Sequence, residues 1–549
     1  MIDSAGTLVS TFCTTDCIRK AVASDRAWLP RPDRMHCIPQ QLRREALELI
    51  TSAIYAADPA IAVRTYLSWA TPTTLTVGGT CVDLAGSSLF VIALGKAAVP
   101  MASEALHILR SNAACPRIRG VVVTKRGTVG SHDNLGLTGL DLLEAAHPQP
   151  DETSVAAGRR ILDLAGCLCV GETVLVLLSG GASALTLVPR DKLSVADLQA
   201  VNAALLGCGA PIGDVNALRK HLSLVGGGQL GARCAAAGAR CVATLALSDV
   251  TGDQLDSIGS GPTVPDSTSW ARCLDIVGRY AGLRAALPAP ALAMLEAGAA
   301  GLLPENPSVA RPCDIACIIG SNALSAAAAA RAAGVLGYHV VRLGSSLEGE
   351  AREVAKVVVA LLLGARAGPS QSDLASPSGR ASGVCLVLGG ETTVTLSGGP
   401  TGLGGRNQEL ALAAALHLAA TVPERASESD PELGPHCAVL SFGTDGGDGP
   451  TDAAGAVVTE WTVRSAAAAG LDAGAALSRH DSHSFFRALG EAGEAEKSSV
   501  YRPGHGATRT GTVGAGGLVR TGPTGTNVCD LVIALFSSSG WAEDHDTCG

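Results

Sequence analysis

The sequence has few aromatic residues, few basic residues for its size and no long apolar run. Trp, Tyr and Phe make up 3% of its 549 residues, so it lacks the stacking surfaces that bind single-stranded nucleic acid. Lys and Arg number 41 against 50 Asp and Glu, a formal net charge of −9, so it also lacks a basic field that attracts phosphate backbones or anionic membranes. No segment approaches the roughly 18 uninterrupted apolar residues of a membrane span. These absences disfavour nucleic acids and membranes as partners and predict a soluble protein that acts on small molecules.

The 17 cysteines form no metal-binding pattern. Close pairs such as Cys13/Cys17 and Cys313/Cys317 are not followed by a second pair or a His at zinc-site spacing. An odd number of scattered cysteines also differs from the dense disulfide framework of a small secreted domain. We therefore expect thiols in a reducing compartment, the cytoplasm.

Residues 1–41 are rich in Ser and Thr and carry both basic and acidic side chains. They contain no continuous apolar core of a secretory signal. A disordered tail is the preferred interpretation, with mitochondrial or plastid targeting as the alternative.

From Leu42 onward, apolar segments typical of strands alternate with Ala-rich segments typical of helices. Continuous apolar strands are covered on both faces, so this alternation predicts an α/β fold with parallel or mixed sheets. The nine expected strands are 90–94, 120–124, 174–178, 242–247, 315–319, 340–343, 384–388, 438–442 and 531–535.

Proline-rich interruptions near 302–312 predict a domain boundary. We expect one α/β domain at 42–305 and a second at 306–549. Three polar or Gly-rich segments, at 364–382, 421–435 and 491–521, are predicted to be surface loops.

Glycine-rich polar motifs directly follow three strands of the first domain, where ligands bind in open α/β sheets. Lys96 follows Gly95 and offers a cation to an anionic ligand, although an exposed loop lysine is the commoner meaning of such a residue alone. The run from Ser179 through Gly180 and Gly181 to Ser183 offers backbone N–H groups and hydroxyls to phosphate or carboxylate, or is a tight turn needed for packing. Asp249 and Asp253, four residues apart, predict Mg²⁺ ligands or a base for a substrate proton, with an Asx turn or helix cap as the alternative.

The second domain carries two further motifs of this kind. Glu391 follows a strand, and Arg406 stands beside glycines at the start of a helix, an arrangement that favours anion binding. A loop with Asp445 and Asp448 follows the next strand and predicts a metal or hydroxyl-binding site. Together the five motifs indicate a phosphate-bearing ligand with Mg²⁺, and hence a phosphotransferase or another nucleotide-using enzyme whose substrate the residues do not name.

Eight motifs, in this order along residues 42–535, resemble the class II glycerate kinases, the glycerate 2-kinase family whose C-terminal half is called the MOFRL domain. The motifs are Leu94-Gly95-Lys96-Ala97, His147-Pro148-Gln149-Pro150-Asp151, Ser179-Gly180-Gly181-Ala182-Ser183, Asn216-Ala217-Leu218-Arg219-Lys220-His221-Leu222-Ser223 with Gly226-Gly227-Gly228-Gln229-Leu230, Ser248-Asp249-Val250, Gly404-Gly405-Arg406-Asn407-Gln408-Glu409, Gly443-Thr444-Asp445-Gly446 with Asp448-Gly449-Pro450-Thr451-Asp452-Ala453, and Gly525-Thr526-Asn527-Val528.

The resemblance implies ATP-dependent phosphorylation of D-glycerate with Mg²⁺, more often to 2-phosphoglycerate than to 3-phosphoglycerate. It also implies two three-layer α/β/α domains, an N-terminal one with a Rossmann-like parallel sheet and a C-terminal MOFRL one with a mixed sheet, and an active-site cleft between them.

The resemblance further implies roles for single residues. Lys96 and Arg406 match positions thought essential in the family and would neutralise the glycerate carboxylate and the transferring phosphoryl group. The Ser179–Ser183 run would be the phosphate cradle, and Asp249 a Mg²⁺ ligand or the catalytic base. Weaker candidates for these two roles are Asp253, Glu391, Asp445 and Asp448. Asn407 and Glu409 would orient the substrate or brace Arg406.

Two departures and two alternatives complete the prediction. Ala146 stands where the family usually has Gly, and 491–521 lengthens a connection that is normally short. Some relatives are called hydroxypyruvate reductases, yet Gly95-Lys96-Ala97 is not the Gly-x-Gly-x-x-Gly of a nicotinamide site. A catalytically inactive binding protein is disfavoured because both Lys96 and Arg406 are present.

Overall fold

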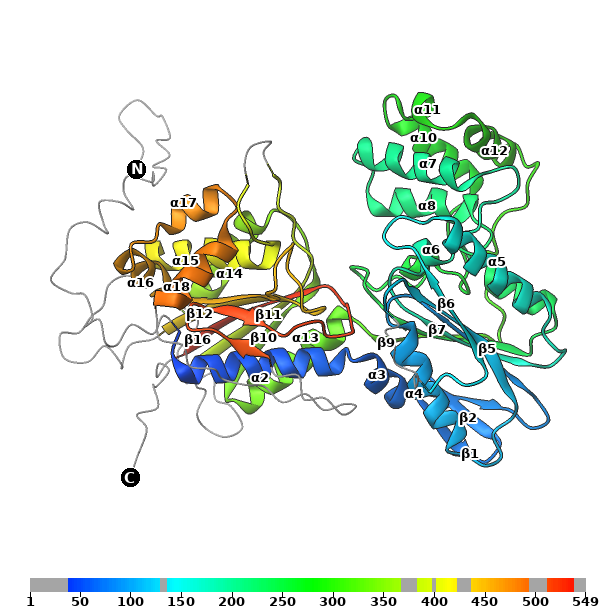
Figure 1. The fold of residues 1–549 in the computed structure, drawn as a ribbon, viewed down its shortest axis with the longest axis horizontal. Helices are drawn as coiled ribbons and strands as arrows, with labels where there is room; N and C mark the ends of the chain where they lie inside the picture. Colours follow the sequence, from blue (N-terminus) through cyan, green and yellow to red (C-terminus); the bar gives the residue numbers. More distant parts are fainter. Residues whose placement is uncertain are drawn as a thin grey trace. The chain divides into compact units, whose positions relative to one another are not determined.

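The computed structural model describes residues 38–128, 136–366, 383–396, 401–421, 436–492 and 511–537. These residues form two compact units (Figure 1). The N-terminal unit comprises Tyr55–Ser325 with Gly525–Val528. The C-terminal unit comprises the described parts of Met1–Ile54, Ala326–Thr524 and Cys529–Gly549.

The N-terminal unit is built on a parallel sheet of six strands in the order β6-β5-β4-β7-β8-β9. The chain runs outward from β4 to β6, then returns beside β4 and runs the other way to β9. This is the strand order of a Rossmann-type sheet, and it confirms the expected parallel fold. The strands are β4 (Leu89–Leu94), β5 (Ile118–Lys125), β6 (Leu140–Ala145), β7 (Thr173–Leu178), β8 (Cys241–Leu247) and β9 (Ile315–Gly320).

Both faces of this sheet are covered by helices. Successive strand side chains point to opposite faces, so Leu89, Val91 and Ala93 of β4 pack in one apolar cluster and the alternate residues of β4 in another. The first cluster is completed by α3 (Pro59–Tyr66) and α4 (Ala98–Arg110), and the second by α5 (Glu152–Gly166) and α9 (Gln229–Ala236). The whole of β4 is buried, which places a rigid strand directly before the Lys96 turn.

Two smaller parts complete the unit. The strands β1 (Leu67–Thr71), β2 (Thr74–Val77) and β3 (Thr80–Asp83) form an antiparallel sheet. A separate group of helices packs around the fully buried Trp270, whose indole N–H donates to the carbonyl of Pro304 at 3.0 Å (Figure 1). These helices are α7 (Val195–Gly207), α8 (Ile212–Leu222), α10 (Trp270–Arg279), α11 (Leu283–Ala286) and α12 (Ala289–Ala299).

The C-terminal unit has a mixed sheet of seven strands in the order β10-β11-β16-β12-β13-β15-β14. Only β10 and β11 pair in parallel, and the other neighbours are antiparallel, as expected for this half. The strands are β10 (Tyr338–Leu347), β11 (Gly383–Gly390), β12 (His436–Gly443), β13 (Gly455–Thr459), β14 (Thr512–Val513), β15 (Leu518–Arg520) and β16 (Asp530–Ser537).

Helices cover both faces of this sheet too. Figure 1 shows α2 and α13 on one face and α14 to α18 on the other. Leu42, Leu49 and Ile50 of α2 are at most 2% exposed and belong to the core of this unit. The helices are α2 (Gln40–Ala56), α13 (Asn322–Val335), α14 (Ala351–Arg366), α15 (Arg406–Thr421), α16 (Thr462–Ala468), α17 (Ala473–Ser478) and α18 (Ser482–Ala492).

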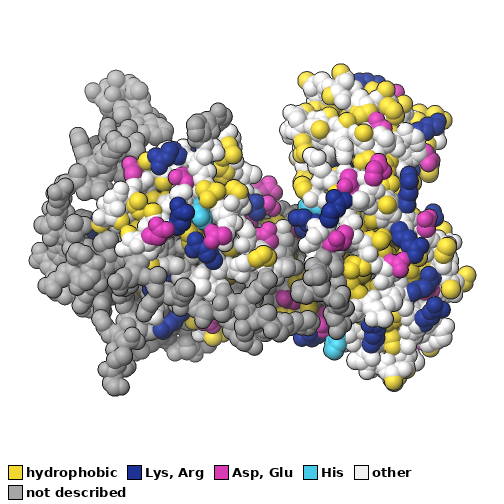
Figure 2. Space-filling model, in the orientation of Figure 1, with side chains coloured by type: hydrophobic (Ala, Val, Ile, Leu, Met, Phe, Trp, Pro, Cys, Tyr) yellow, Lys and Arg dark blue, Asp and Glu magenta, His cyan; other side chains and the backbone are white. Residues whose placement is uncertain are grey.

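The surface and the helix lengths bear on partners. Basic and acidic side chains are interspersed over the face of the described residues that Figure 2 shows. Among the helices that the structure describes, no single one is long and apolar enough to cross a membrane. Helices α2 and α3, taken together as a bent pair, have the length and composition of a membrane span, on those two criteria alone.

All nine expected strands are present, but the contacts change the expected boundaries. The segment at 315–319, expected in the second domain, forms edge strand β9 of the N-terminal sheet, so the boundary lies near Ser325 and not near 305. Helix α2, expected in the first domain, packs in the C-terminal unit. The expected boundary follows chain order, whereas packing against a distant sheet decides to which unit these two elements belong.

The loop predictions are corrected in part. The end of the 491–521 segment forms β14 and β15, because Leu518 and Val519 are buried in the core of the sheet. Helix α14 extends to Arg366, within the segment at 364–382. Helices α15 and α18 likewise reach into the other two segments, to Thr421 and Ala492. Residues 367–382, 422–435 and 493–510 of the predicted loops, and residues 1–37 of the predicted tail, lie outside the described residues.

Candidate functional site

Two of the predicted motifs meet where the strand order reverses, at the carboxyl ends of β4 and β7. The backbone N–H of Lys96 donates to the carbonyl of Gly180 at 3.0 Å, and the N–H of Ala97 donates to Ser179 Oγ at 3.0 Å. Gly95 has φ +118°, and a Cβ there would collide with Ser179. The glycine therefore lets the Lys96 turn lie directly on the Ser179 turn, at the position where α/β sheets bind ligands.

The predicted carboxylate Asp249 joins the same place from the end of β8. A Cβ added to Gly180 would collide with the carboxylate of Asp249, so this side chain lies over the bare backbone of the glycine. Only glycine leaves room for so close an approach. The acid is thus placed beside the predicted phosphate cradle.

Lys96 and His147 reach the next residue of the cradle. A Cβ on Gly181 would lie 3.0 Å from His147 Cδ2 and 3.3 Å from Lys96 Cε. Burial, and then the charges of Lys96 and Lys125, lower the pKa of His147 from 6.5 to about 4. The imidazole is therefore neutral at pH 7, and Lys96, which is exposed, carries the positive charge. We call Lys96, His147, Ser179–Ser183 and Asp249 the glycine-turn cluster.

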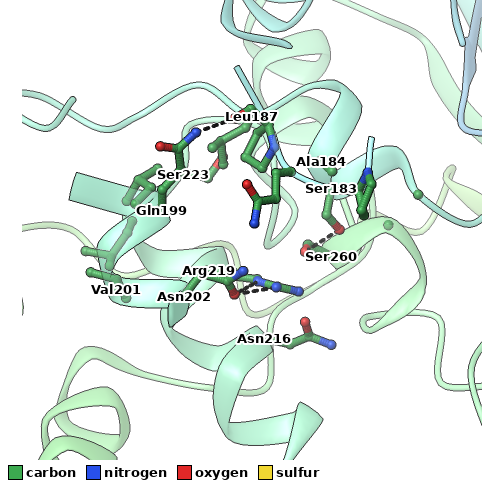
Figure 3. A pocket seen from close by; sticks show the side chains of 18 of the residues that line it. Ser183, Ala184, Leu187, Gln199, Val201, Asn202, Asn216, Arg219, Ser223 and Ser260 are labelled. Carbon is green, nitrogen blue, oxygen red and sulfur yellow. Dashed lines mark hydrogen bonds between the residues drawn. The ribbon is translucent and has the colours of Figure 1, made fainter. Parts of the chain in front are cut away.

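A cavity of about 730 Å³ adjoins this cluster, within the N-terminal unit. Gly181, Ser183 and Asp249 line it, and so does Ser260, whose hydroxyl lies 2.7 Å from that of Ser183 (Figure 3). Much of its remaining wall comes from α7 and α8, with residues 147–150 completing it. Of the residues predicted for this place, Lys96, Ser179 and Gly180 do not line the cavity.

The sequence motif 216–223 was noted only as part of the family resemblance, and its polar residues were not predicted to belong to the site. Asn216, Arg219 and Ser223 line the cavity, and Nε of Arg219 donates to Oδ1 of Asn202 at 3.0 Å (Figure 3). The signal was their spacing of three and four residues, which places them on one helix face. Between them, Lys220 turns away and pairs with Asp266 at 2.7 Å.

In the C-terminal unit, Arg406 lies between two carboxylates. It forms a two-pronged ion pair with the buried Asp530, one prong being Nη2 to Oδ1 at 3.0 Å, and Nη1 lies 3.0 Å from Glu391 Oε1. Burial alone would lower the pKa of Arg406, but Asp530, Glu391 and Asp448 raise it. Arg406 stays protonated, although its charge is already matched within the protein.

Asp448 holds the start of α15. Its Oδ1 accepts from Asn407 N at 3.0 Å, and its Oδ2 accepts from Gln408 N at 2.8 Å and Gln408 Nε2 at 2.9 Å. Asp448 is 2% exposed, so both oxygens serve these buried donors. The geometry is that of a helix cap from a distant loop, in place of the predicted metal ligand.

The remaining predicted residues of α15 also bind protein groups. Glu409 accepts from Arg352 Nη2 at 2.6 Å and lies 2.9 Å from His480 Nδ1, so it braces Arg352 and not Arg406. Asn407 Oδ1 accepts from the hydroxyl of Ser441 at 2.6 Å. Both side chains are buried, which makes them positioning residues within the unit.

The other predicted metal ligands are not gathered with a third ligand. Asp445 is exposed and accepts from Gly447 N at 3.0 Å in an Asx turn, and Asp253 lies in a turn with φ +54°. Within the described ranges no group of three His, Cys, Asp or Glu side chains has the geometry of a metal site. Magnesium commonly binds through one or two carboxylates together with substrate phosphates. Asp249 beside the glycine turn fits that mode of binding.

Comparison with known proteins covers most of the chain. Residues 45–296 match the DUF4147 family, described as a domain of unknown function, and residues 384–530 match the MOFRL family. A glycerate 2-kinase of Pyrococcus horikoshii is 33% identical over 91% of this chain and 99% of its own length. An Agrobacterium vitis protein, provisionally named a hydroxypyruvate reductase, is 35% identical over 90% of this chain and 94% of its own length.

A solved structure is similar as well. The crystal structure of glycerate kinase from Thermotoga maritima matches 90% of this chain and 100% of that chain, with a TM-score of 0.69 and 32% identity. The similarity therefore extends over both units and both halves of the motif set. On this evidence the chain belongs to the glycerate kinase family.

Proposed function

We propose that this protein transfers the terminal phosphoryl group of ATP to D-glycerate, with the 2-hydroxyl as acceptor and 2-phosphoglycerate as product. The observation that carries the proposal is the glycine-turn cluster. It sets a cation, a glycine-lined turn and a carboxylate together at the strand-order reversal. The named activity of the Pyrococcus relative supports the choice of the 2-hydroxyl.

The cluster suits phosphoryl transfer because such catalysis is mainly positioning and charge neutralisation. Lys96 is exposed beside the turn and is free to follow the phosphoryl oxygens. His147, being neutral, can share a hydrogen bond there without adding a second charge. Backbone N–H groups of the turn would bind phosphate oxygens.

Asp249 is the residue proposed to take the proton of the glycerate hydroxyl or to hold Mg²⁺. It is the carboxylate that lines the cavity within the described part of the chain, and its side chain lies against Gly180. Magnesium, when bound by phosphates and this carboxylate, supplies charge neutralisation.

Arg406 is proposed to bind the carboxylate of glycerate by exchanging one of its present partners. Glu391 is 46% exposed and Asp530 is 6% exposed, so the pair with Glu391 is the weaker one. An incoming carboxylate would displace Glu391 and keep Asp530, which fixes the guanidinium plane.

The test is ADP release by the purified full-length chain with ATP, Mg²⁺ and D-glycerate, followed by phosphorus NMR of the product. We expect glycerate-dependent ADP release and a phosphate coupled to the proton on carbon 2. Lys96→Ala should lower kcat by about 10²- to 10³-fold without loss of folding. Lys356→Ala, an exposed lysine of α14, is the matched control and should leave kcat unchanged.

The alternative, an NAD(P)H-dependent hydroxypyruvate reductase, is favoured by the name of the Agrobacterium relative. The turn after β4 reads Gly95-Lys96-Ala97, without the glycines that admit a dinucleotide pyrophosphate. Oxidation of NADH or NADPH by hydroxypyruvate, with no ADP formed from glycerate, would reverse the assignment.

A further inference from the structure

The cavity beside the glycine-turn cluster is much larger than the proposed acceptor needs. Its 730 Å³ falls in the range of sites that enclose ligands of nucleotide size. A three-carbon acid would leave most of that volume filled by water against apolar walls. The volume therefore points to a second, bulkier substrate component.

Part of the wall contributed by α7 and α8 is apolar. Leu206 at the end of α7 and Ile212 at the start of α8 are 60% and 62% exposed, and both line the cavity. Val201 lines it as well, and Figure 3 places Val201 and Gln199 on the side away from Ser183 and Ser260. The cavity thus has an apolar side and a hydroxyl-lined side.

One polar side chain in the cavity lacks a protein partner. Asn216 is 8% exposed, and no hydrogen bond joins its amide to another described residue. The amide lines the cavity, so a ligand there that offers both a donor and an acceptor can hydrogen-bond to it. The edges of a nucleobase and the hydroxyls of a ribose both do so.

Arg219 adds a directed cation to the same wall. Nε and Nη2 of its guanidinium donate to Oδ1 of Asn202, which fixes the plane, while Nη1 has no acceptor among the described residues. A planar, fixed guanidinium stacks on a base or donates to a phosphate. Gly181 lines the cavity as well, and a Cβ on it would lie 3.3 Å from Lys96 Cε, so Lys96 lies next to this part of the lining.

We propose that the cavity between α7, α8 and the Gly181 turn is the nucleoside site of the phosphoryl donor. The base lies against the apolar side of α7 and α8, Asn216 and Arg219 hydrogen-bond to the nucleoside, and the phosphates extend towards Gly181 and Lys96. This assignment rests on the proposed function, because it takes ATP as the donor. It makes α7 and α8 the nucleotide-binding elements of the N-terminal unit.

The experiment fills the cavity without disturbing the core. Ala203 is exposed on α7 and lines the cavity, so Ala203→Trp occupies the volume proposed for the base. Ala271→Trp, on an exposed position of α10 outside the cavity, is the matched control. Binding of ADP to the full-length proteins is measured by titration calorimetry in the absence of glycerate.

We expect Ala203→Trp to weaken ADP binding at least tenfold and to raise KM for ATP, with KM for D-glycerate unchanged. Asn216→Leu, which keeps the side-chain shape, should weaken ADP binding by about tenfold. Ala271→Trp should bind ADP as the parent does. Thermal unfolding of each variant establishes that it is folded.

Three results would overturn the assignment. The first is unchanged ADP binding in folded Ala203→Trp and Asn216→Leu. The second is a rise in KM for glycerate alone, which would make the cavity the acceptor site. The third is a parent chain that binds no ADP. If ADP binding is lost in the variants while the parent phosphorylates no glycerate, the nucleoside site stands and the proposed acceptor is wrong. Binding without turnover therefore separates the two proposals.

Discussion

At the scale of single residues, the surroundings of Arg406 decide how its charge can be used. One guanidinium faces Asp530 and Glu391, so the three groups together carry a net negative charge. Such a cluster does not attract an anion until a carboxylate leaves or is neutralised. Glu391 is half-exposed, so it is the carboxylate that can leave Arg406 at the smaller cost in free energy.

This arrangement predicts opposite effects for the two acidic partners. Glu391→Gln should lower KM for glycerate by about three- to tenfold, because it removes a competitor for Arg406, with little change in the free energy of unfolding. Asp530→Asn should lower that free energy by about 1–3 kcal/mol, since it removes the buried charge that holds Arg406. Steady-state kinetics and urea denaturation measure the two effects. A loss of kcat in Glu391→Gln as large as that in Arg406→Ala would instead give Glu391 a direct part in the chemistry.

His147 makes the stability of the folded chain depend on pH. Its pKa is about 4 in the folded chain and 6.5 when unperturbed. Between these values the unfolded state binds a proton that the folded state does not, so the free energy of unfolding contributed by His147 falls as pH drops from about 6.5 to 4.

Replacing His147 should remove that contribution. We expect the stability of His147→Gln relative to the parent to improve as pH is lowered from about 7 to 4.5, measured by urea denaturation at each pH. His107→Gln, at an exposed position of α4, is the control and should track the parent. Parallel curves for His147→Gln and the parent would contradict the lowered pKa.

At the scale of elements, the first turn of α15 is held by a residue that lies 40 positions away. Asp448 accepts from the backbone and side chain of both Asn407 and Gln408. Four donors would lose their acceptor if it were removed. The motif that suggested a metal site in the sequence therefore joins a loop to a helix.

Removal of this cap should appear in stability and not in metal dependence. Asp448→Ala should lower the free energy of unfolding by about 2–3 kcal/mol, because buried donors are left unsatisfied. The Mg²⁺ concentration that gives half-maximal turnover should stay the same. Asp445→Ala, which removes one exposed contact in the same loop, is the control and should change stability little. A tenfold shift in the Mg²⁺ requirement without loss of stability would restore the metal interpretation.

At the scale of the whole molecule, the position of an element along the chain does not decide to which of the two compact units it belongs. Helix α2 precedes the N-terminal unit in the sequence, yet its apolar face lies in the core of the C-terminal unit. Tyr338 at the start of β10 donates its hydroxyl to Glu45 of α2 at 2.6 Å. The C-terminal unit is therefore completed by a helix from the opposite end of the chain.

A core substitution in α2 should accordingly affect the C-terminal unit. Leu49→Ala should cost about 2–4 kcal/mol, since Leu49 is fully buried. Hydrogen exchange should rise in β11, β12 and β16 and stay unchanged in β4, β7 and β8. Glu48→Ala, one residue away and exposed, is the control. Faster exchange confined to the N-terminal sheet would show that α2 stabilises the other unit.

Local sequence patterns were sufficient to predict many of the strands and the glycine turns of this molecule. The nine apolar segments became strands, and the glycine turns with Lys96, Ser179 and Asp249 came together, because parallel strands end at the same edge of their sheet. The strands β1 to β3, β6 and β13 to β15 were not predicted. The expected cleft between the domains stays a prediction.

The sequence by itself determined the α/β class, the positions of nine strands and the family, since these depend on periodicity and on motifs of neighbouring residues. Only the tertiary structure decided the strand order, the place of α2 and β9, the cap formed by Asp448 and the cavity with Asn216 and Arg219. The reason is physical: each of these depends on contacts between residues far apart in the chain, as Arg406 and Asp530 are by 124 positions. Packing and the need to satisfy buried polar groups select those contacts, and no local pattern encodes them.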